Sequence, residues 1–167
     1  MMKRLLLLAI GIGALSACAP PPAPAPPAQD VAADEAAMKA EAAVWFDHFN
    51  KGDADAMAAL YAEDALVLPD KAPAKQGRAA FREYIAGEIA GMKAAGLSFK
   101  DGGPSGAGVS GDLGWISGTY SVVDASGKAV DTGKYLSVHR RTNGKWLYIR
   151  DTWNSDVAPP PAPAPKK

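Results

Sequence analysis

Cysteine and histidine are nearly absent from this chain of 167 residues. One Cys cannot form an internal disulfide or a multi-cysteine metal site, and two His residues 91 positions apart do not suggest a histidine-rich site. An excess of positive charge is missing too, because 18 acidic residues balance 18 basic ones, so charge gives no reason to expect nucleic-acid binding. Ser-His-Asp, Cys-His and phosphate-loop signatures are also lacking. We therefore expect no metal, no cofactor and no nucleic-acid partner.

Proline is scarce in the middle of the chain and dense near both ends. Six of the 14 prolines lie in residues 20–27 and five in residues 159–165. All 18 acidic residues, but only 14 of the 18 basic ones, lie within residues 30–156, so this stretch is mildly acidic. These shifts divide the chain into a leader, a linker, one globular domain and a Pro/Ala-rich tail. The four parts span residues 1–17, 18–30, 31–156 and 157–167.

The first 18 residues have the pattern of a secretory targeting segment. Lys3 and Arg4 precede an apolar and glycine run of 11 residues, Leu5–Leu15, which is shorter than the roughly 20 residues of a membrane-spanning helix. Residues 15–18 read Leu-Ser-Ala-Cys, which resembles the lipobox of bacterial lipoproteins, in which the cysteine is lipidated. The resemblance implies lipidation of Cys18. An ordinary secretory signal with a chance cysteine is the alternative.

Lipidation would decide where the protein resides. Lipoproteins of this type carry more than one acyl chain, which is enough for stable attachment to a membrane without insertion. Ala19 follows the cysteine, and by analogy with such lipoproteins a non-acidic residue there favours the periplasmic face of the outer membrane. Residues 19–29 are expected to form an extended polyproline II spacer of roughly 30 Å. The tail has the same composition, and we expect it to be disordered.

Helical spacing of apolar residues dominates the first half of the domain. Residues 31–51 predict a long helix that ends at Gly52, a residue suited to a left-handed cap. Asp53 can then cap a short second helix. Residues 65–68 are a short apolar run that predicts a first strand, and residues 78–95 predict a third helix.

After Gly96 the apolar period changes from 3.6 to 2, which predicts strands. Asn143-Gly144 is a strong hairpin signal between the last two of them. Helices followed by an antiparallel meander predict an α+β fold, in which a curved sheet wraps around the long N-terminal helix and two further helices. A cavity is expected where helix and sheet diverge. The predicted strands span residues 97–101, 113–124, 133–142 and 145–154.

Three stretches of the domain resemble one known superfamily. Residues 49–67 are similar to the opening of a SnoaL-like, nuclear transport factor 2-like domain, where a helix ends in N-x-G-D before a short helix and a strand. Residues 76–81 resemble its third-helix start, and the hairpin of residues 133–154 resembles the branch called domain of unknown function 4440. The resemblance implies a cone-shaped, cystatin-like roll with a pocket. It does not imply one activity, because this fold hosts isomerases, cyclases, hydrolases, ligand binders and interaction modules.

The best understood relative, ketosteroid isomerase, would need three groups that the aligned positions lack. Its helix tyrosine falls on Trp45, its strand base falls on Pro69, and its protonated aspartate falls near residues 135–137, where no carboxylate stands. Steroid isomerase chemistry is therefore not expected. Asp70 lies one residue beyond the base position and is either a shifted base or an ordinary loop residue.

Asp151 is the most informative carboxylate. It alternates with Leu147, Ile149 and Trp153, which places an acid on the apolar face of the last strand, where loss of solvation should raise its pKa. It is either a general base or ligand contact, or a buried acceptor for structural hydrogen bonds. Tyr135 and His139 alternate on the preceding strand. If their face points inward, they converge with Asp151 as a candidate catalytic cluster.

The domain is rich in aromatic residues for its size, and in a cone some core aromatics also form the wall of the pocket. We expect an envelope lipoprotein whose domain binds a small, partly hydrophobic ligand. An isomerase, cyclase or hydratase that uses Asp151 as base is one alternative. A homodimeric interaction module is another, because such domains often pair through the convex sheet face. The expected ligand-binding residues are Trp45, Phe49, Tyr61, Leu68, Phe81, Trp115, Asp151 and Trp153.

Overall fold

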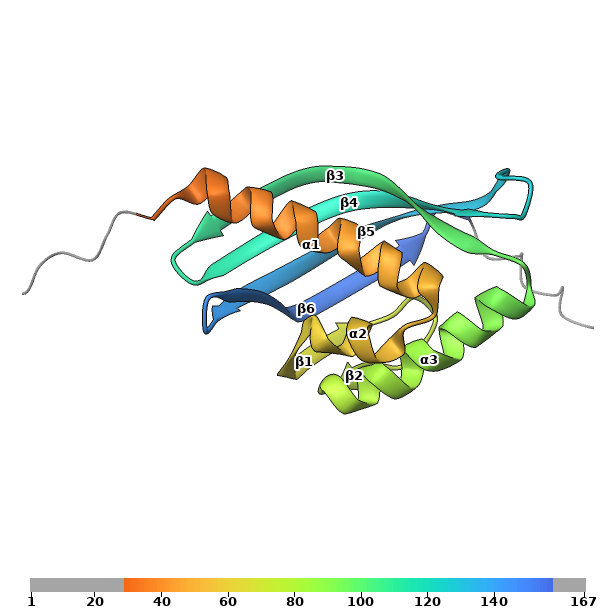
Figure 1. The fold of residues 1–167 in the computed structure, drawn as a ribbon, viewed down its shortest axis with the longest axis horizontal. Helices are drawn as coiled ribbons and strands as arrows, with labels where there is room; N and C mark the ends of the chain where they lie inside the picture. The colour runs from red at the N-terminus through yellow and green to blue at the C-terminus, as the bar shows by residue number, and fades with distance from the viewer. Residues whose placement is uncertain (1–28, 158–167) are drawn as a thin grey trace, which may run out of the picture.

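The computed structural model describes residues 29–157, so Cys18, the leader and nearly all of the linker and tail lie outside the described residues. Within that range no helix is both long and apolar enough to cross a membrane. The described chain has three helices and six strands (Figure 1). They are α1 (Val31–Lys51), α2 (Ala54–Ala59), β1 (Tyr61–Leu68), β2 (Lys75–Gln76), α3 (Arg78–Ala94), β3 (Ser98–Ser110), β4 (Leu113–Val123), β5 (Ala129–Thr142) and β6 (Lys145–Ser155).

The helical half follows the sequence closely. The side chain of Asp30 accepts a hydrogen bond from the amide of Ala33 and starts α1, and Gly52 ends it in the left-handed conformation at φ 81°. Asp53 caps α2 in the same way, through the amide of Ala56. The aspartate caps satisfy free amide groups and the Gly52 amide satisfies free carbonyl groups at the helix ends. The predicted roles of Gly52 and Asp53 are confirmed.

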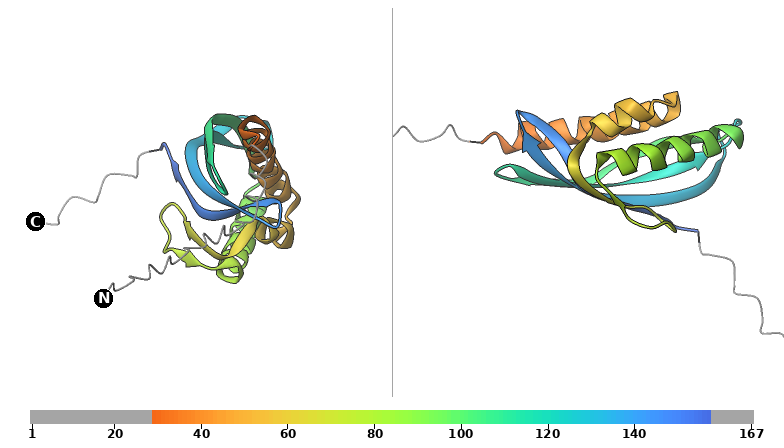
Figure 2. Two further views of the ribbon diagram at one scale, coloured as in Figure 1. Left: turned by 90° about the vertical axis from the view of Figure 1, so that its left-hand side faces the viewer. Right: turned by 90° about the horizontal axis from the view of Figure 1, so that it is seen from below.

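One curved sheet holds all six strands, in the order β2-β1-β6-β5-β4-β3. Strands β3 to β6 form an antiparallel meander, and β1 joins its edge in parallel with β6. Helix α1 lies along the concave face, while α2 and α3 pack beside β1 (Figures 1 and 2). The α+β cone expected from the sequence is confirmed.

Strand β3 differs from the prediction. It runs from Ser98 to Ser110 rather than stopping at residue 101, and the segment Gly102-Gly103-Pro104 lies inside it rather than in a turn. The pairing with β4 shifts register on both sides of Pro104. Proline is tolerated there because β3 is an edge strand with irregular pairing, where a missing backbone donor costs little. The Gly and Pro residues therefore lie in a bulged strand, and ending the predicted strand at residue 101 was wrong.

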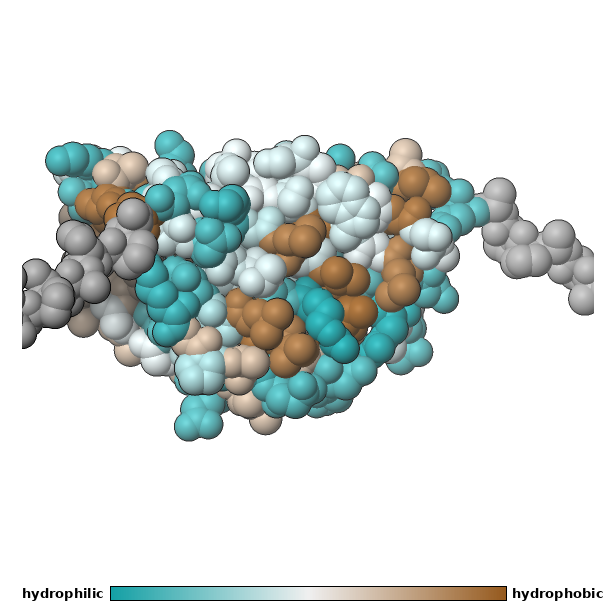
Figure 3. Space-filling view, turned by 180° about the vertical axis from the view of Figure 1, so that it is seen from behind, coloured by the Kyte–Doolittle hydropathy of each residue, from teal (hydrophilic) through white to brown (hydrophobic). Residues whose placement is uncertain are grey.

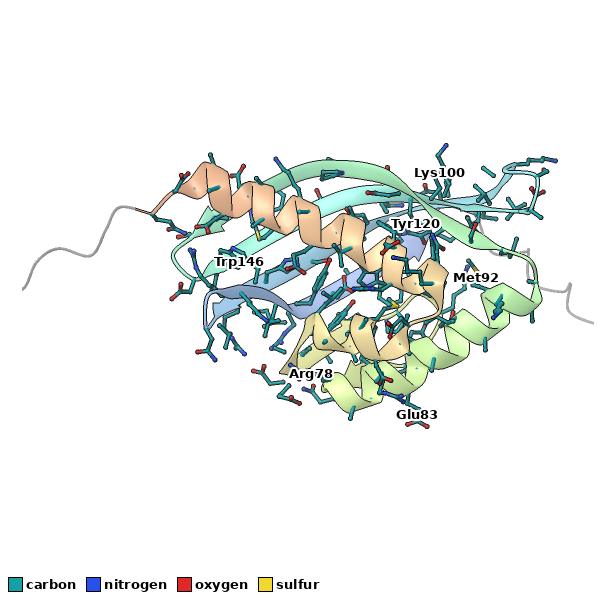
Figure 4. All side chains as sticks on the ribbon, in the orientation of Figure 1. Arg78, Glu83, Met92, Lys100, Tyr120 and Trp146 are labelled. Atoms are coloured by element: carbon teal, nitrogen blue, oxygen red, sulfur yellow. The ribbon has the colours of Figure 1, made fainter. Side chains whose placement is uncertain are left out.

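Two glycines on the inner face let large rings lie flat against the sheet. A side chain at Gly118 would collide with the ring of Tyr135, and one at Gly133 would collide with the ring of Tyr120 and the carbonyl of Asn154. Both tyrosines can therefore lean along the sheet instead of standing away from it. Figure 4 shows Tyr120 and Trp146 at opposite ends of this face, with the start of α1 near Trp146.

A polar cluster fixes the first described residues to the rest of the domain. The amide of Gln29 donates to Asp34 at 2.9 Å and to the carbonyl of Gly111 in the β3–β4 turn at 2.8 Å. Arg141 grips Asp34 with two bonds of 2.7 Å each, and its guanidinium lies 4.6 Å from the Trp146 ring centre. The bonds from Gln29 and Arg141 hold the pKa of Asp34 below its ordinary value. We call these residues the N-terminal clamp.

Candidate functional site

A narrow cavity lies between α1 and the concave face of the sheet. Its solvent-accessible volume is about 40 Å³, which is room for a few water molecules at roughly 10–15 Å³ each. Aromatic rings form most of the wall and reach it from α1 and from all four long strands. The lining residues are Ala42, Trp45, Phe46, Phe99, Tyr120, Tyr135, Ser137, Tyr148, Asp151 and Trp153.

Asp151 is held at the cavity by two hydroxyl groups. Its Oδ2 accepts a hydrogen bond from Tyr61 Oη at 2.5 Å, and its Oδ1 accepts one from Ser137 Oγ at 2.7 Å. Tyr61 Oη in turn accepts a bond of 2.9 Å from Trp45 Nε1. The chain of bonds from Trp45 through Tyr61 to Asp151 joins α1, β1 and β6, and Ser137 adds β5. The hydrogen-bond network of Asp151 therefore links helix α1 to strands β1, β5 and β6.

Opposing influences act on the pKa of Asp151. Burial raises it, and the hydrogen bonds from Tyr61, Ser137 and the amide of Thr152 lower it, with burial the stronger. No Lys or Arg nitrogen lies within 4.0 Å of this carboxylate in the described part of the chain. Asp151 is thus a desolvated acid without a cationic partner. Burial and the nearby Asp151 also raise the pKa of Tyr61 well above its usual value.

Tyr135 brings a hydroxyl that has no hydrogen-bond partner within the described residues. The Oη atom is buried and makes no hydrogen bond to any residue between 29 and 157, and its ring packs edge-on against Phe46 at 6.2 Å between centres. Burial, with Asp101 and Asp151 nearby, raises the pKa of Tyr135 to about 12. The group is therefore protonated at neutral pH and free to donate a hydrogen bond to a ligand.

His139 lies next to this cluster but outside the cavity wall. Its side chain is fully buried, and both ring nitrogens lack a hydrogen-bond partner within the described residues. The ring packs against Tyr148 at 4.0 Å between centres, and burial lowers the pKa of His139 to about 4. The neutral imidazole of His139 therefore packs as part of the core beside Tyr148. The question left open by the sequence is settled: Tyr135, Ser137 and His139 face inward, while Leu136 is 48% exposed outside.

The expected ligand-binding residues fall into three groups. Trp45, Asp151 and Trp153 line the cavity, whereas Phe49, Tyr61 and Phe81 are buried in the core behind it. Leu68 and Trp115 are each 44% exposed on the outer side of the sheet, so including them was wrong. Alternation explains both errors, because the neighbours that point inward are Val67 beside Leu68, and Gly114 and Ile116 beside Trp115.

Sequence reasoning also omitted several cavity residues. Ser137 could have been found, because it lies between Tyr135 and His139 on the same face of β5 and opposite Asp151. Asp70 is a half-buried loop residue outside the cavity, paired with Lys71 at 3.2 Å, and it accepts a weak bond from the amide of Ser155. The other cavity residues that were missed are Ala42, Phe46, Phe99, Tyr120 and Tyr148.

A cone of this topology with an interior cavity defines the nuclear transport factor 2-like class with a cystatin-like fold. The SnoaL-like domain family matches residues 42–149, and the chain belongs to that family. No curated protein matches the chain.

Solved structures of low sequence identity share the fold. A nuclear transport factor 2-like protein from Novosphingobium aromaticivorans is 23% identical, with a TM-score of 0.66 over 73% of this chain and 81% of its own. A protein of unknown function from Pseudomonas putida is 18% identical, with a TM-score of 0.66 over 77% and 98% of the two chains. One from Nostoc punctiforme is 18% identical, with a TM-score of 0.65 over 77% and 96%. These likenesses establish the fold alone.

Proposed function

We propose that this protein is an envelope lipoprotein whose SnoaL-like domain, of the branch called domain of unknown function 4440, binds a small, partly hydrophobic ligand. The observation that carries the binding function is an aromatic cavity with a carboxylate and an unpartnered hydroxyl beside it. Binding pockets have this composition, in which apolar walls supply affinity and a few polar groups fix orientation. Asp151 and Ser137 supply the polar contacts on one wall, and Tyr135 supplies a donor.

The narrowness of the cavity limits affinity. A ligand that buries about 200 Å² of apolar surface gains about 5 kcal/mol, which corresponds to a Kd of about 0.2 mM before the costs of association are subtracted. We therefore expect small ligands to bind in the roughly millimolar range. A tighter natural ligand must gain further energy from the polar groups.

Filling the cavity is expected to abolish binding. Ala42 is buried on α1 and lines the cavity, so Ala42→Leu places three more carbon atoms in it. We expect the affinity for 3,3-dimethylbutan-1-ol, a compact neutral probe, to fall by at least about tenfold, which is about 1.4 kcal/mol. The measurement is the shift of the Trp45 indole N–H signal in NMR titrations of the full chain. Ala43→Leu, one residue along on the exposed side of α1, is the matched control, and equal binding by both variants would contradict the proposed site.

The anchor rests on the sequence around Cys18 and has its own test. Lipidation adds apolar chains that hold a protein at a membrane, so Cys18→Ser is expected to move the protein from the membrane fraction to the soluble fraction after cell lysis. Intact mass spectrometry should show the loss of the lipid. A membrane-bound, unmodified Cys18→Ser protein would show that something other than this cysteine attaches it.

A second candidate function is proton transfer, favoured by the raised pKa of Asp151 at the cavity wall. In that case Asp151 removes a proton from a bound substrate and Tyr135 donates to the developing oxyanion. Deuterium exchange at the α-carbon of cyclohexanone, followed by NMR, is a direct assay of such chemistry. Exchange above the buffer rate that disappears in Asp151→Asn supports an enzyme, and exchange at the buffer rate rejects it for this substrate class.

A third candidate, a homodimeric module, is favoured by apolar side chains on the convex face of the sheet (Figure 3). Leu113 is 51% exposed and Leu136 is 48% exposed, with Trp115 between them in the sheet register. Trp115 also lies across Gly106 and Gly108 of β3. Sedimentation at several protein concentrations separates the cases, because a dimer through this face should dissociate in Leu136→Ser and a monomer should not change.

A further inference from the structure

We propose that the cavity selects a small organic cation, an amine or quaternary ammonium group carried on an apolar body. This inference rests on the proposed ligand binding and specifies the ligand's charge. Two independent features support it: the arrangement of the rings in the wall, and the sign of the charges around them.

The cavity is lined by aromatic rings, and neighbouring rings in its wall meet at steep angles. The centres of Trp45 and Trp153 are 6.4 Å apart with an interplanar angle of 60°, and those of Phe99 and Tyr120 are 5.3 Å apart at 82°. Rings at such angles present both faces and edges around one space. Ring faces carry negative electrostatic potential and attract alkylammonium groups, and aromatic cages of this kind bind quaternary ammonium ligands. Seven of the ten lining residues are aromatic: Trp45, Phe46, Phe99, Tyr120, Tyr135, Tyr148 and Trp153.

The cavity wall carries an acid and no basic side chain among the residues that the structure describes. Asp151 is the only charged residue in its wall, and no Lys or Arg lines it among residues 29–157. Tyr61, Ser137 and the amide of Thr152 occupy three acceptor positions of the carboxyl group, and a carboxylate has about four lone-pair sites, so one remains. Among residues 29–157, Asp151 has no cationic partner. A cationic ligand in the cavity would supply that partner.

Carboxylates also act on two of the lining tyrosines. Burial raises the pKa of Tyr120 to about 12, and the negative charges of Asp131, Asp70 and Asp156 add to this shift. Asp101 acts in the same way on Tyr135, again after burial. Lys71 and Lys134 partly neutralise two of these acids.

The two lysines lie 3.2 Å from Asp70 and 2.5 Å from Asp156. Within the described residues, Asp101, Asp131 and Asp151 have no such partner. The carboxylates that act on Tyr120 and Tyr135 thus outnumber the lysines paired with them, and an anionic ligand would be repelled by them and by an ionised Asp151.

Three probes of nearly equal shape and different charge test the inference on the full chain. They are choline (cationic), 3,3-dimethylbutan-1-ol (neutral) and 3,3-dimethylbutanoate (anionic). We expect choline to bind at least about tenfold more tightly than the alcohol and the carboxylate not to bind, as measured by NMR titration of the Trp45 indole signal. If the alcohol or the carboxylate binds as well as choline, the cavity binds ligands but does not select cations, and the inference is wrong. If none of the three binds, the inference and the proposed binding function both fail.

Two variants separate charge from ring contributions. Asp151→Asn keeps the side-chain shape and is expected to weaken choline binding by about tenfold while leaving the alcohol within about twofold. Trp153→Leu removes a ring but keeps apolar surface, and should weaken choline by about fivefold with little change for the alcohol. Asp47→Asn is the matched control, because Asp47 lies on the exposed side of α1 and pairs with Lys51.

Circular dichroism checks that each variant folds. If Asp151→Asn does not fold, the probe series and Trp153→Leu still decide the question. Equal losses for choline and the alcohol in Trp153→Leu would assign the ring a purely apolar role and overturn the cation–ring part of the inference.

Discussion

Tyr61→Phe is expected to lower the free energy of unfolding by about 2–3 kcal/mol at pH 7. The substitution removes one hydroxyl that serves two buried groups, because Tyr61 Oη donates to Asp151 and accepts from Trp45. Hydrogen bonds to charged groups contribute about 1.5–3 kcal/mol, and leaving a buried partner unsatisfied adds to the loss. Urea unfolding followed by circular dichroism measures the change.

The loss should be smaller at low pH. The bond from Tyr61 stabilises the ionised form of Asp151, whose folded pKa is raised by burial. An acid with a raised folded pKa keeps more protons in the folded state, so its contribution to stability declines as pH rises from its unfolded pKa to its folded pKa. Without Tyr61 Oη the folded pKa rises further, which makes this decline larger in Tyr61→Phe than in the wild type. The destabilisation should therefore be greater at pH 7 than at pH 3.

A neighbouring tyrosine provides the control for this prediction. Tyr148 is buried and stacks on Tyr61 at 4.8 Å between ring centres. Among residues 29–157 the side-chain donors to Asp151 are Tyr61 and Ser137 and not Tyr148, so Tyr148→Phe is expected to change stability much less. An equal loss in Tyr61→Phe at both pH values would mean that the bond does not stabilise the carboxylate.

Gly133→Ala is expected to cost about 3 kcal/mol of stability, a large value for the addition of one methyl group. The new Cβ would overlap the end of the Tyr120 ring and the backbone carbonyl of Asn154. The carbonyl belongs to the β5–β6 ladder and cannot move without breaking the sheet, so the strain cannot be relieved by one side-chain rotation. Because Tyr120 lines the cavity, ligand binding should weaken as well. Thermal and urea unfolding, with probe titration, measure both effects.

Gly87 provides the opposite case on the same chain. It lies in α3, and a Cβ there would meet nothing within 4 Å. Gly87→Ala should stabilise the protein by about 0.5–1 kcal/mol, because alanine loses less conformational entropy in a helix. If Gly87→Ala and Gly133→Ala changed stability by the same amount, close packing at Gly133 would not explain the loss of stability in Gly133→Ala.

Local signals in the sequence predicted the helices and most strands. Asp30, Gly52 and Asp53 act through their own backbone neighbours, so their roles could be recognised without knowledge of the fold. Strand β3 could not be predicted in the same way. Its continuation through Gly102 and Pro104 depends on pairing with β4, which is distant in the sequence.

The prediction that Asp151 is buried was right, but the reasoning for it was partly wrong. Simple alternation grouped Asp151 with Leu147 and Ile149, yet Trp146 and Tyr148 are the buried residues of that strand. A register shift between β5 and β6 leaves Ile149 as an extra residue, so the inward face changes parity before Asp151. Periodicity alone cannot reveal such a bulge, because it is specified by pairing with another strand.

The N-terminal clamp has a mechanical consequence. A force transmitted through the residues before Gln29 reaches the β3–β4 turn and the start of α1, because Gln29 bonds to both Gly111 and Asp34. Tyr120 and the adjoining cavity wall lie toward the other end of the domain (Figure 4). If the domain is anchored through that end, as proposed from Cys18, the load falls on the β3–β4 turn and the start of α1 and not on Tyr120.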